Sequence, residues 1–185
     1  MIWSPLSNLL LYGATARVDA AKRAGVRIGL GSDWSPSGSK NLLGELKVAW
    51  LYSQHALGGL FDARDLVAMA TRDAAAILKW RKALGTLEPG KRADVVVIDG
   101  TVGDPYEALI QARETSIRLV MINGVARYGM PALIGALGPQ GQTLRVGGQP
   151  RRLFLEQGTA DPDVASVSLS AARSALRAAF RWAIR

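Results

Sequence analysis

The fold of this chain is decided by the stretch Val26-Arg27-Ile28-Gly29-Leu30-Gly31-Ser32-Asp33-Trp34. Apart from Arg27 it is apolar as far as Gly31, which is typical of a strand covered on both faces. The carboxylate of Asp33 then follows the strand directly. Parallel α/β barrels place active-site residues where a strand ends and a loop begins. The stretch therefore predicts a barrel-type strand over Val26–Gly31 and marks Asp33 as a candidate functional residue.

Helical patterns surround this strand. A helix is expected over Ala14–Ala24, after a turn at Ser4–Asn8. Asn41 and Asp62 are predicted to cap two later helices, and a further helix is expected over Ala74–Trp80. Helices alternating with a buried strand indicate an αβ unit of a parallel sheet or barrel.

The pattern becomes mainly β after Gly85. Four stretches favour strands, the second being a hairpin around Asn123-Gly124: Asp94–Asp99, Ile117–Tyr128, Thr143–Val146 and Arg152–Leu155. This change predicts a second domain. We divide the chain at residues 1–84, 85–160 and 161–185.

The final segment, Leu169–Arg185, has the spacing of an amphipathic helix. Its basic positions are Arg173, Arg177, Arg181 and Arg185, and its apolar positions are Leu169, Ala172, Leu176, Phe180 and Ala183. We expect the helix to dock through the apolar stripe and leave the arginines in solvent. Membrane or nucleic-acid contact is the alternative interpretation.

The charge balance raises the question of nucleic acid. The formal net charge is +8 and the isoelectric point about 10.3. However, the basic residues form no block beyond Arg151-Arg152 and the mixed segment Lys79–Lys82, and only 6% of residues are aromatic. Base-stacking surfaces need more aromatic side chains. A basic nucleic-acid-binding module is therefore kept only as an alternative.

Composition also bears on location and redox chemistry. The chain has no cysteine, which excludes disulfides and thiolate metal sites and is compatible with a cytoplasmic location. No apolar run reaches the roughly 18 residues of a membrane span, and the first residues do not resemble a signal peptide. We expect a cytoplasmic protein with no membrane partner.

A near match to a phosphate-binding loop runs from Gly85 to Arg92. It ends on Arg92 where the magnesium-binding hydroxyl should stand, and Pro89 removes a backbone donor. A strand is predicted after it where that motif needs a helix N-terminus. We therefore reject nucleotide binding at this loop.

Asp33 itself has two interpretations. It is either a loop carboxylate that caps backbone donors or a ligand and proton carrier in a metal-dependent hydrolase. Trp34 could form a wall of a substrate pocket, although packing is the commoner role of tryptophan. His55, the single histidine, has no partner at helical spacing and is interpreted as a surface or packing residue.

Four blocks together resemble one protein family. In chain order they are Ser4–Leu9, Gly25–Asp33, Met69–Ala75 and Gly85–Val97. They resemble the amidohydrolase superfamily, and most closely its aminohydrolase and chlorohydrolase branch, which includes cytosine-deaminase-like enzymes. Asn123-Gly124 also fits a later hairpin of that family.

The resemblance implies a (β/α)₈ barrel joined to a β-sandwich. Val26–Gly31 would be the eighth barrel strand, and Asp33 the aspartate that contacts a divalent metal, zinc or iron. The reaction implied is hydrolysis of non-peptide carbon–nitrogen bonds in a small molecule, such as deamination of a cyclic amidine or amide.

The sequence departs from the family in its ligands. The H-x-H pair of the first barrel strand and the later histidines of the family have no counterpart here. We therefore expect a C-terminal portion that is inactive alone and that needs a missing N-terminal portion or homo-oligomer formation. The alternatives are a non-catalytic remnant or assembly module and the basic module named above.

Overall fold

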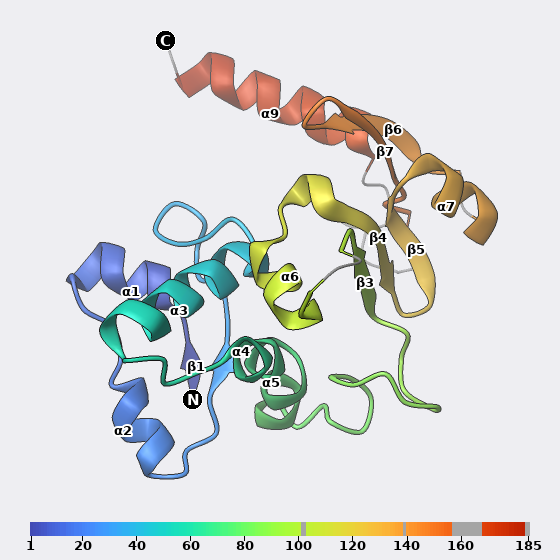
Figure 1. Cartoon of the computed structure of the whole chain (residues 1–185). Coiled ribbons are helices and arrows are strands. Elements are labelled where there is room, and N and C mark those ends of the chain that lie inside the picture. The colour runs from blue at the N-terminus through green and yellow to red at the C-terminus, as the bar shows by residue number, and fades with distance from the viewer. Residues whose placement is uncertain (101–102, 139, 157–167, 184–185) are drawn as a thin grey trace. The chain divides into compact units, whose positions relative to one another are not determined.

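The computed structural model describes residues 1–100, 103–138, 140–156 and 168–183. The chain is mixed α/β and divides into two compact units (Figure 1). Unit 1 comprises Met1–Arg92 and Ile98–Ser116, and unit 2 comprises Ala93–Val97 and Ile117–Arg185. The expected division at residues 84 and 160 stays a prediction, and residues 157–167, around its second boundary, lie outside the described residues.

Unit 1 begins with a parallel strand pair. β1 (Ile2–Trp3) lies beside β2 (Gly29–Leu30), with Ile2 opposite Gly29 and Trp3 opposite Leu30. The predicted strand over Val26–Gly31 was too long. Only two of its residues have a partner strand among the described residues, although Gly31 N still donates to Trp3 O at 3.0 Å.

Two helices lie between these strands in the chain. α1 (Pro5–Tyr12) follows β1 directly, so the turn predicted at Ser4–Asn8 was wrong. Pro5 is the first helical residue, where its missing N–H has no intrahelical role and its fixed φ favours the helix. α2 (Val18–Arg23) is shorter than the helix expected over Ala14–Ala24 and ends before Gly25, whose φ is +70°.

The other helices of unit 1 pack around this pair. They are α3 (Leu42–Ala56), α4 (Ala63–Ala70), α5 (Arg72–Ile77), α6 (Pro105–Gln111) and the 3₁₀ turn η1 (Glu114–Ser116). Both predicted caps are confirmed: Asn41 accepts from Gly44 N at 3.1 Å, and Asp62 accepts from Asp65 N at 2.7 Å. The helix predicted over Ala74–Trp80 starts and ends earlier, as α5.

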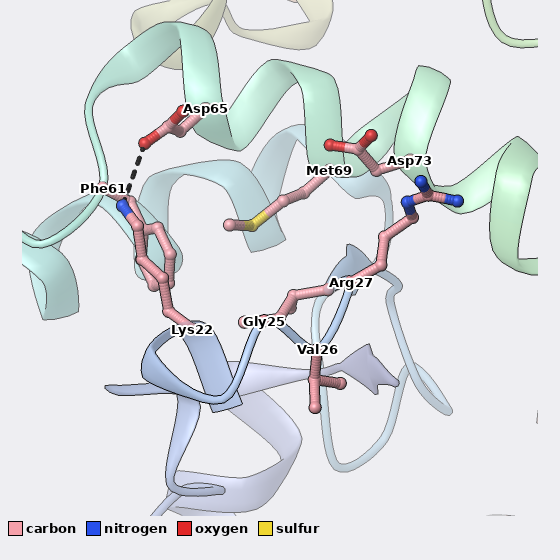
Figure 2. Close-up of a pocket in the computed structure, with 9 residues that line it drawn as sticks. Lys22, Gly25, Val26, Arg27, Phe61, Asp65, Met69 and Asp73 are labelled. Atoms are coloured by element: carbon pink, nitrogen blue, oxygen red, sulfur yellow. Dashed lines mark hydrogen bonds and ion pairs between the residues drawn. The ribbon is translucent and has the colours of Figure 1, made fainter. Parts of the chain in front are cut away.

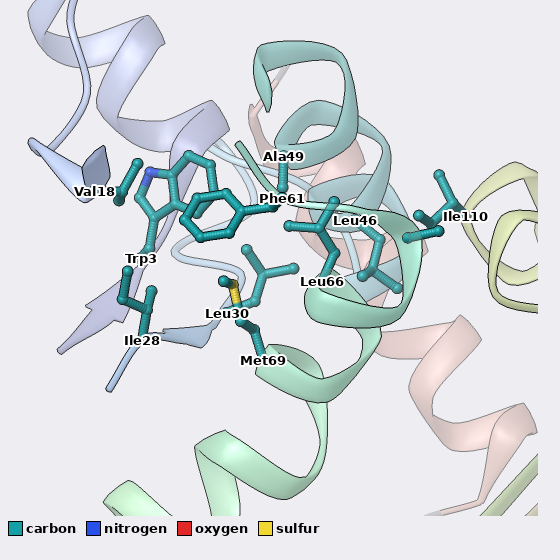
Figure 3. Close-up of a cluster of buried hydrophobic side chains, with 11 residues drawn as sticks. Trp3, Val18, Ile28, Leu30, Leu46, Ala49, Phe61, Leu66, Met69 and Ile110 are labelled. Atoms are coloured by element: carbon teal, nitrogen blue, oxygen red, sulfur yellow. The ribbon is translucent and has the colours of Figure 1, made fainter. Parts of the chain in front are cut away.

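The core of unit 1 surrounds Trp3 (Figure 3). The Trp3 ring is fully buried and meets Tyr52 edge-on at 6.2 Å and Phe61 at 6.1 Å. The buried hydroxyl of Ser53 donates to Phe61 O at 2.9 Å and accepts from Phe61 N at 2.8 Å. Because Trp3 belongs to β1 and Leu30 of the same core to β2, this core fixes the ends of both strands.

Unit 2 is an antiparallel sheet in the order β3-β4-β5-β7-β6. The strands are β3 (Val95–Ile98), β4 (Ile117–Ile122), β5 (Val125–Gly129), β6 (Gln142–Val146) and β7 (Gln149–Leu153). The predicted hairpin is confirmed: Asn123 and Gly124 have φ values of 51° and 79°, which a tight hairpin turn requires.

Two helices complete unit 2. α7 (Pro131–Leu137) packs on the sheet, where Ile134 joins Leu119 and Ala126 in a small core. α9 (Leu169–Ala183) confirms the predicted C-terminal helix as far as Ala183; Arg185 lies outside the described residues. The expected docking of its apolar stripe holds only in the first turn, where Leu169 is half-buried and its N donates to Gln142 Oε1 at 2.6 Å. Farther along, the stripe is exposed: Leu176 at 67% and Phe180 at 73%. Among the described helices, none is both long and apolar enough to cross a membrane.

Candidate functional site

The site is built at the edge where β1 and β2 end. Because the two strands are parallel, their carboxyl ends lie at the same edge. α1 starts after β1 and places Ser7 there, whereas Asp33 follows β2 three residues beyond its last residue. The expectation that Asp33 lies just beyond the carboxyl end of its strand agrees with this arrangement.

Two hydrogen bonds fix the Asp33 carboxylate. The buried Ser7 Oγ donates to Oδ2 at 2.7 Å, and Trp34 N donates to Oδ1 at 2.8 Å. Both bonds stabilise the charged carboxylate and lower the pKa of Asp33, the Ser7 bond more than the Trp34 bond. The side chain is exposed, so it is an ionised, oriented and solvent-accessible acceptor at neutral pH.

The loop after Asp33 folds back over this pair. A Cβ built on Gly38 would lie 3.3 Å from Trp34 O and 3.5 Å from the Ser7 Cβ. An added Cβ would therefore be tight against Trp34 O and in ordinary van der Waals contact with Ser7. The close approach keeps Ser7 covered while Asp33 stays open.

A second carboxylate, Glu45 on α3, makes hydrogen bonds to the backbone at the same edge. The sequence did not predict it. It is fully buried, and its oxygens accept from Leu6 N at 3.2 Å and from Ser39 N at 3.4 Å. Leu6 N is one of the unpaired donors in the first turn of α1. Glu45 thus joins the helix that carries Ser7 to the loop that follows Asp33. Its signal in the sequence was its place between Leu42 and Ala49 on the buried face of the helix.

Trp34 contributes its backbone rather than its ring to this arrangement. The side chain is 72% exposed, and its predicted role in a substrate pocket stays a prediction. His55 is exposed in the last turn of α3. The near match to a phosphate loop is a turn: Lys91 contacts Thr86 and lies 3.3 Å from Glu88, and β3 rather than a helix follows.

The donor set does not fit a complete metal centre. No cluster of three or more histidine, cysteine, aspartate or glutamate side chains occurs among the described residues. A catalytic zinc usually takes three protein ligands and one water. Asp33 offers a carboxylate with its orientation already fixed, which is one ligand of such a set.

A hollow of about 280 Å³ lies at the opposite end of β2 (Figure 2). Residues 25–28, which precede the strand, line it together with Lys22, Phe61, Asp65, Met69 and Asp73. Lys22 Nζ is already engaged: it donates to Leu60 O at 2.7 Å and lies 3.4 Å from Asp65 Oδ2. Because its lysine is already paired, we assign no site to this hollow.

Residues 4–127 match the family model described as "Amidohydrolase family". Curated relatives include the 5-methylthioadenosine/S-adenosylhomocysteine deaminases of Symbiobacterium thermophilum and Teredinibacter turnerae. Each is 37% identical to this chain, over 99 and 102 residues. The matches cover 51% and 54% of this chain but only 23% of each relative.

Solved structures of a deaminase and a chlorohydrolase are also similar to this chain. An adenosine deaminase from Xanthomonas campestris with bound zinc is 25% identical, with a TM-score of 0.62 over 68% of this chain and 31% of that chain. The atrazine chlorohydrolase of Arthrobacter aurescens TC1 complexed with zinc is 30% identical, with a TM-score of 0.56 over 68% of this chain and 30% of that chain.

Proposed function

Because this chain belongs to the amidohydrolase family, we propose that it carries part of the active site of a hydrolase that cleaves non-peptide carbon–nitrogen bonds. The reaction class is the deamination of a small cyclic amidine or amide. The observation that carries the proposal is the Asp33 carboxylate, held at the carboxyl end of β2 by Ser7 and Trp34 N. The relatives named as deaminases support the reaction class.

In this proposal Asp33 moves protons. Its lowered pKa keeps it ionised, so it can accept a proton from the attacking water and return it to the leaving amine. Ser7 holds Oδ2, and the buried Glu45 holds the helix that presents Ser7. Trp34 lies beside the carboxylate, exposed to solvent, where it can contact a flat ring.

The metal is a second part of the proposal. A divalent ion, zinc or alternatively iron, would activate the water, and zinc is named with two similar structures. Asp33 would supply one ligand. Since the described residues do not complete the set, we propose that the other ligands come from protein beyond these 185 residues.

The same reasoning gives the proposed architecture. Residues 1–84 would be the C-terminal part of a (β/α)₈ barrel, of which β1 and β2 are two parallel strands, and residues 85–160 part of a β-sandwich. Residues 161–185 would form the C-terminal helix. We propose a cytoplasmic location, since the chain contains no cysteine.

A fusion tests the activity. The part of the Symbiobacterium thermophilum deaminase that precedes the matched region is joined to this chain, loaded with zinc and assayed for ammonia release from 5-methylthioadenosine. We expect turnover by the fusion and none by the chain alone. Asp33→Asn should lower turnover by about 10²–10⁴-fold, whereas Asp62→Asn, which keeps a helix cap, should not change it.

Two results would contradict the proposal. Turnover by the chain alone would disprove its incompleteness, and a folded, zinc-loaded but inactive fusion would favour a non-catalytic remnant or assembly module.

Nuclear magnetic resonance tests the site without a fusion. Ser7→Ala should raise the pKa of Asp33, because it removes the principal bond that lowers it.

A further inference from the structure

α9 has two chemically distinct sides. On a helix with 3.6 residues per turn, Leu169, Leu176 and Phe180 fall within one narrow sector. The adjacent side carries arginine and serine: Ser170, Arg173, Ser174, Arg177 and Arg181. Alanines and Trp182 occupy the remaining surface.

Beyond the first turn of α9 the apolar side has no cover among the described residues. Leu176 is 67% and Phe180 73% exposed, whereas Leu169 and Ala172 in the first turn are half-buried. Leaving such side chains in water forgoes about 1.5–3 kcal/mol for each large one that could be buried. A cluster of this kind on one helix marks an interaction surface rather than a scatter of single exposed residues.

The polar side is uniformly positive. Residues 168–185 contain four arginines and no acidic residue. Within the described parts of the chain, no ion pair joins Arg173, Arg177 or Arg181 to a carboxylate. The occupant of this surface must therefore bring negative charge together with apolar matter.

In place of the sequence-based expectation of no membrane partner, we propose that α9 binds the surface of an anionic membrane and lies in the plane of the interface. Leu176 and Phe180 enter the acyl boundary, and the arginines contact the lipid phosphates. The helix lies on the bilayer rather than across it: it has 15 residues, whereas a span needs about 20 apolar residues. A strongly charged side beside a stripe of leucine and phenylalanine is the pattern of interfacial helices.

Nucleic acid and a second copy of the chain fit less well. Phosphate contacts to DNA or RNA would satisfy the arginines but leave Leu176 and Phe180 in water. The α9 helix of a second copy could cover the apolar stripe, but it contains no acidic residue to pair with the arginines. An anionic bilayer satisfies both sides of the helix at once.

The test is co-sedimentation of the full chain with vesicles. One set contains phosphatidylglycerol and phosphatidylcholine in equal parts, and the other contains phosphatidylcholine alone. We expect binding to the anionic set, weakened by salt. Arg177→Gln with Arg181→Gln should reduce binding about fivefold for each arginine removed, and Leu176→Ser with Phe180→Ser by at least about tenfold for each side chain. Arg81→Gln with Lys82→Gln removes the same charge from unit 1 and should change binding less than about twofold.

Two results would overturn the proposal. The chain would show no preference for anionic vesicles, or the Leu176→Ser, Phe180→Ser variant would bind as strongly as the unmodified chain. Duplex DNA binding without vesicle binding would assign the helix to nucleic acid, and a dimer dispersed by the serine variant would assign it to a second copy. If the serine variant loses helix content by circular dichroism, the arginine pair and the salt dependence decide alone.

Discussion

The two units of this molecule bury very different amounts of apolar side chain. Among the described residues, eleven buried hydrophobic side chains form one cluster in unit 1, whereas the cluster of unit 2 has three: Leu119, Ala126 and Ile134. Unit 1 can therefore hold the Ser7–Asp33 pair against a packed core. Unit 2 depends on backbone pairing and a tight turn, and its longest helix offers its apolar face to solvent.

The largest expected effect is in the core of unit 1. Trp3→Ala should destabilise the chain by about 3–5 kcal/mol, because the ring is fully buried between Tyr52 and Phe61 and donates to Thr15 Oγ1 at 2.7 Å. Urea denaturation followed by circular dichroism measures the loss. The matched control is Trp34→Ala, which removes a ring that is 72% exposed and should cost about 0.5 kcal/mol or less. Equal losses in the two variants would contradict the assigned core.

The next effect sharpens the contrast with unit 2. Ile134→Ala should cost about 2 kcal/mol, the low end for such a truncation, because its cluster is small and has partly buried neighbours that can close. Hydrogen exchange should show that the amides of β4 and β5 lose protection, whereas the amides of α3 keep theirs. Leu137→Ala, which truncates a side chain 49% exposed on the same helix, is the control. Lost protection throughout unit 1 would break the division into two units.

The turn of unit 2 should show a smaller effect. Gly124 has a φ of 79°, so Gly124→Ala should cost about 1 kcal/mol because a Cβ is strained in that conformation. Gly135→Ala in α7 is the matched control. Apart from its chain neighbours and the helix backbone, no described atom lies within 4 Å of the added methyl group. Alanine should therefore stabilise the helix by about 0.5–1 kcal/mol. Thermal denaturation of both variants should therefore give shifts of opposite sign.

The smallest effect concerns pH and unit 1. Lys40 Nζ lies 2.7 Å from Glu114 Oε1. This contact is the principal cause that lowers the pKa of the Glu114 carboxyl from 4.5 to about 2, with hydrogen bonds from its own backbone N–H and from Asn41. Since the folded pKa is lower, the contribution to stability is present above pH 4.5 and is lost as the pH falls towards 2. Glu114→Gln should flatten this part of the stability profile, and Glu107→Gln on α6 should not. A steep profile retained in Glu114→Gln would count against the pair.

The helices that the sequence failed to predict share a cause. α1, α6 and α7 begin with Pro5, Pro105 and Pro131 at the first helical position. Proline was interpreted there as a turn or as part of a β region, although it also starts helices. The sequence correctly predicted the helices capped by Asn41 and Asp62, because these side chains accept hydrogen bonds from the first helical amides. It also predicted the hairpin at Asn123-Gly124, because these two residue types readily adopt the positive φ values that the turn requires.

The candidate site was predicted only in its exposed part. Asp33 was found from the strand that precedes it, since a carboxylate after a buried strand is a local pattern. Ser7 and Glu45 were not, because their contacts join residues 26 and 39 positions apart. Neither a serine in an apparent turn nor a glutamate in a helix reveals such a partner without the tertiary structure.

The parallel pair of β1 and β2 has one further consequence. In the described part of the chain their sheet holds these two strands and no others, so the outer edge of each strand faces no partner strand. Such an edge is a template for any extended segment of matching register. A peptide that paired there would lie beside the Trp3 core. It would add a strand to the sheet whose carboxyl edge carries Ser7 and Asp33.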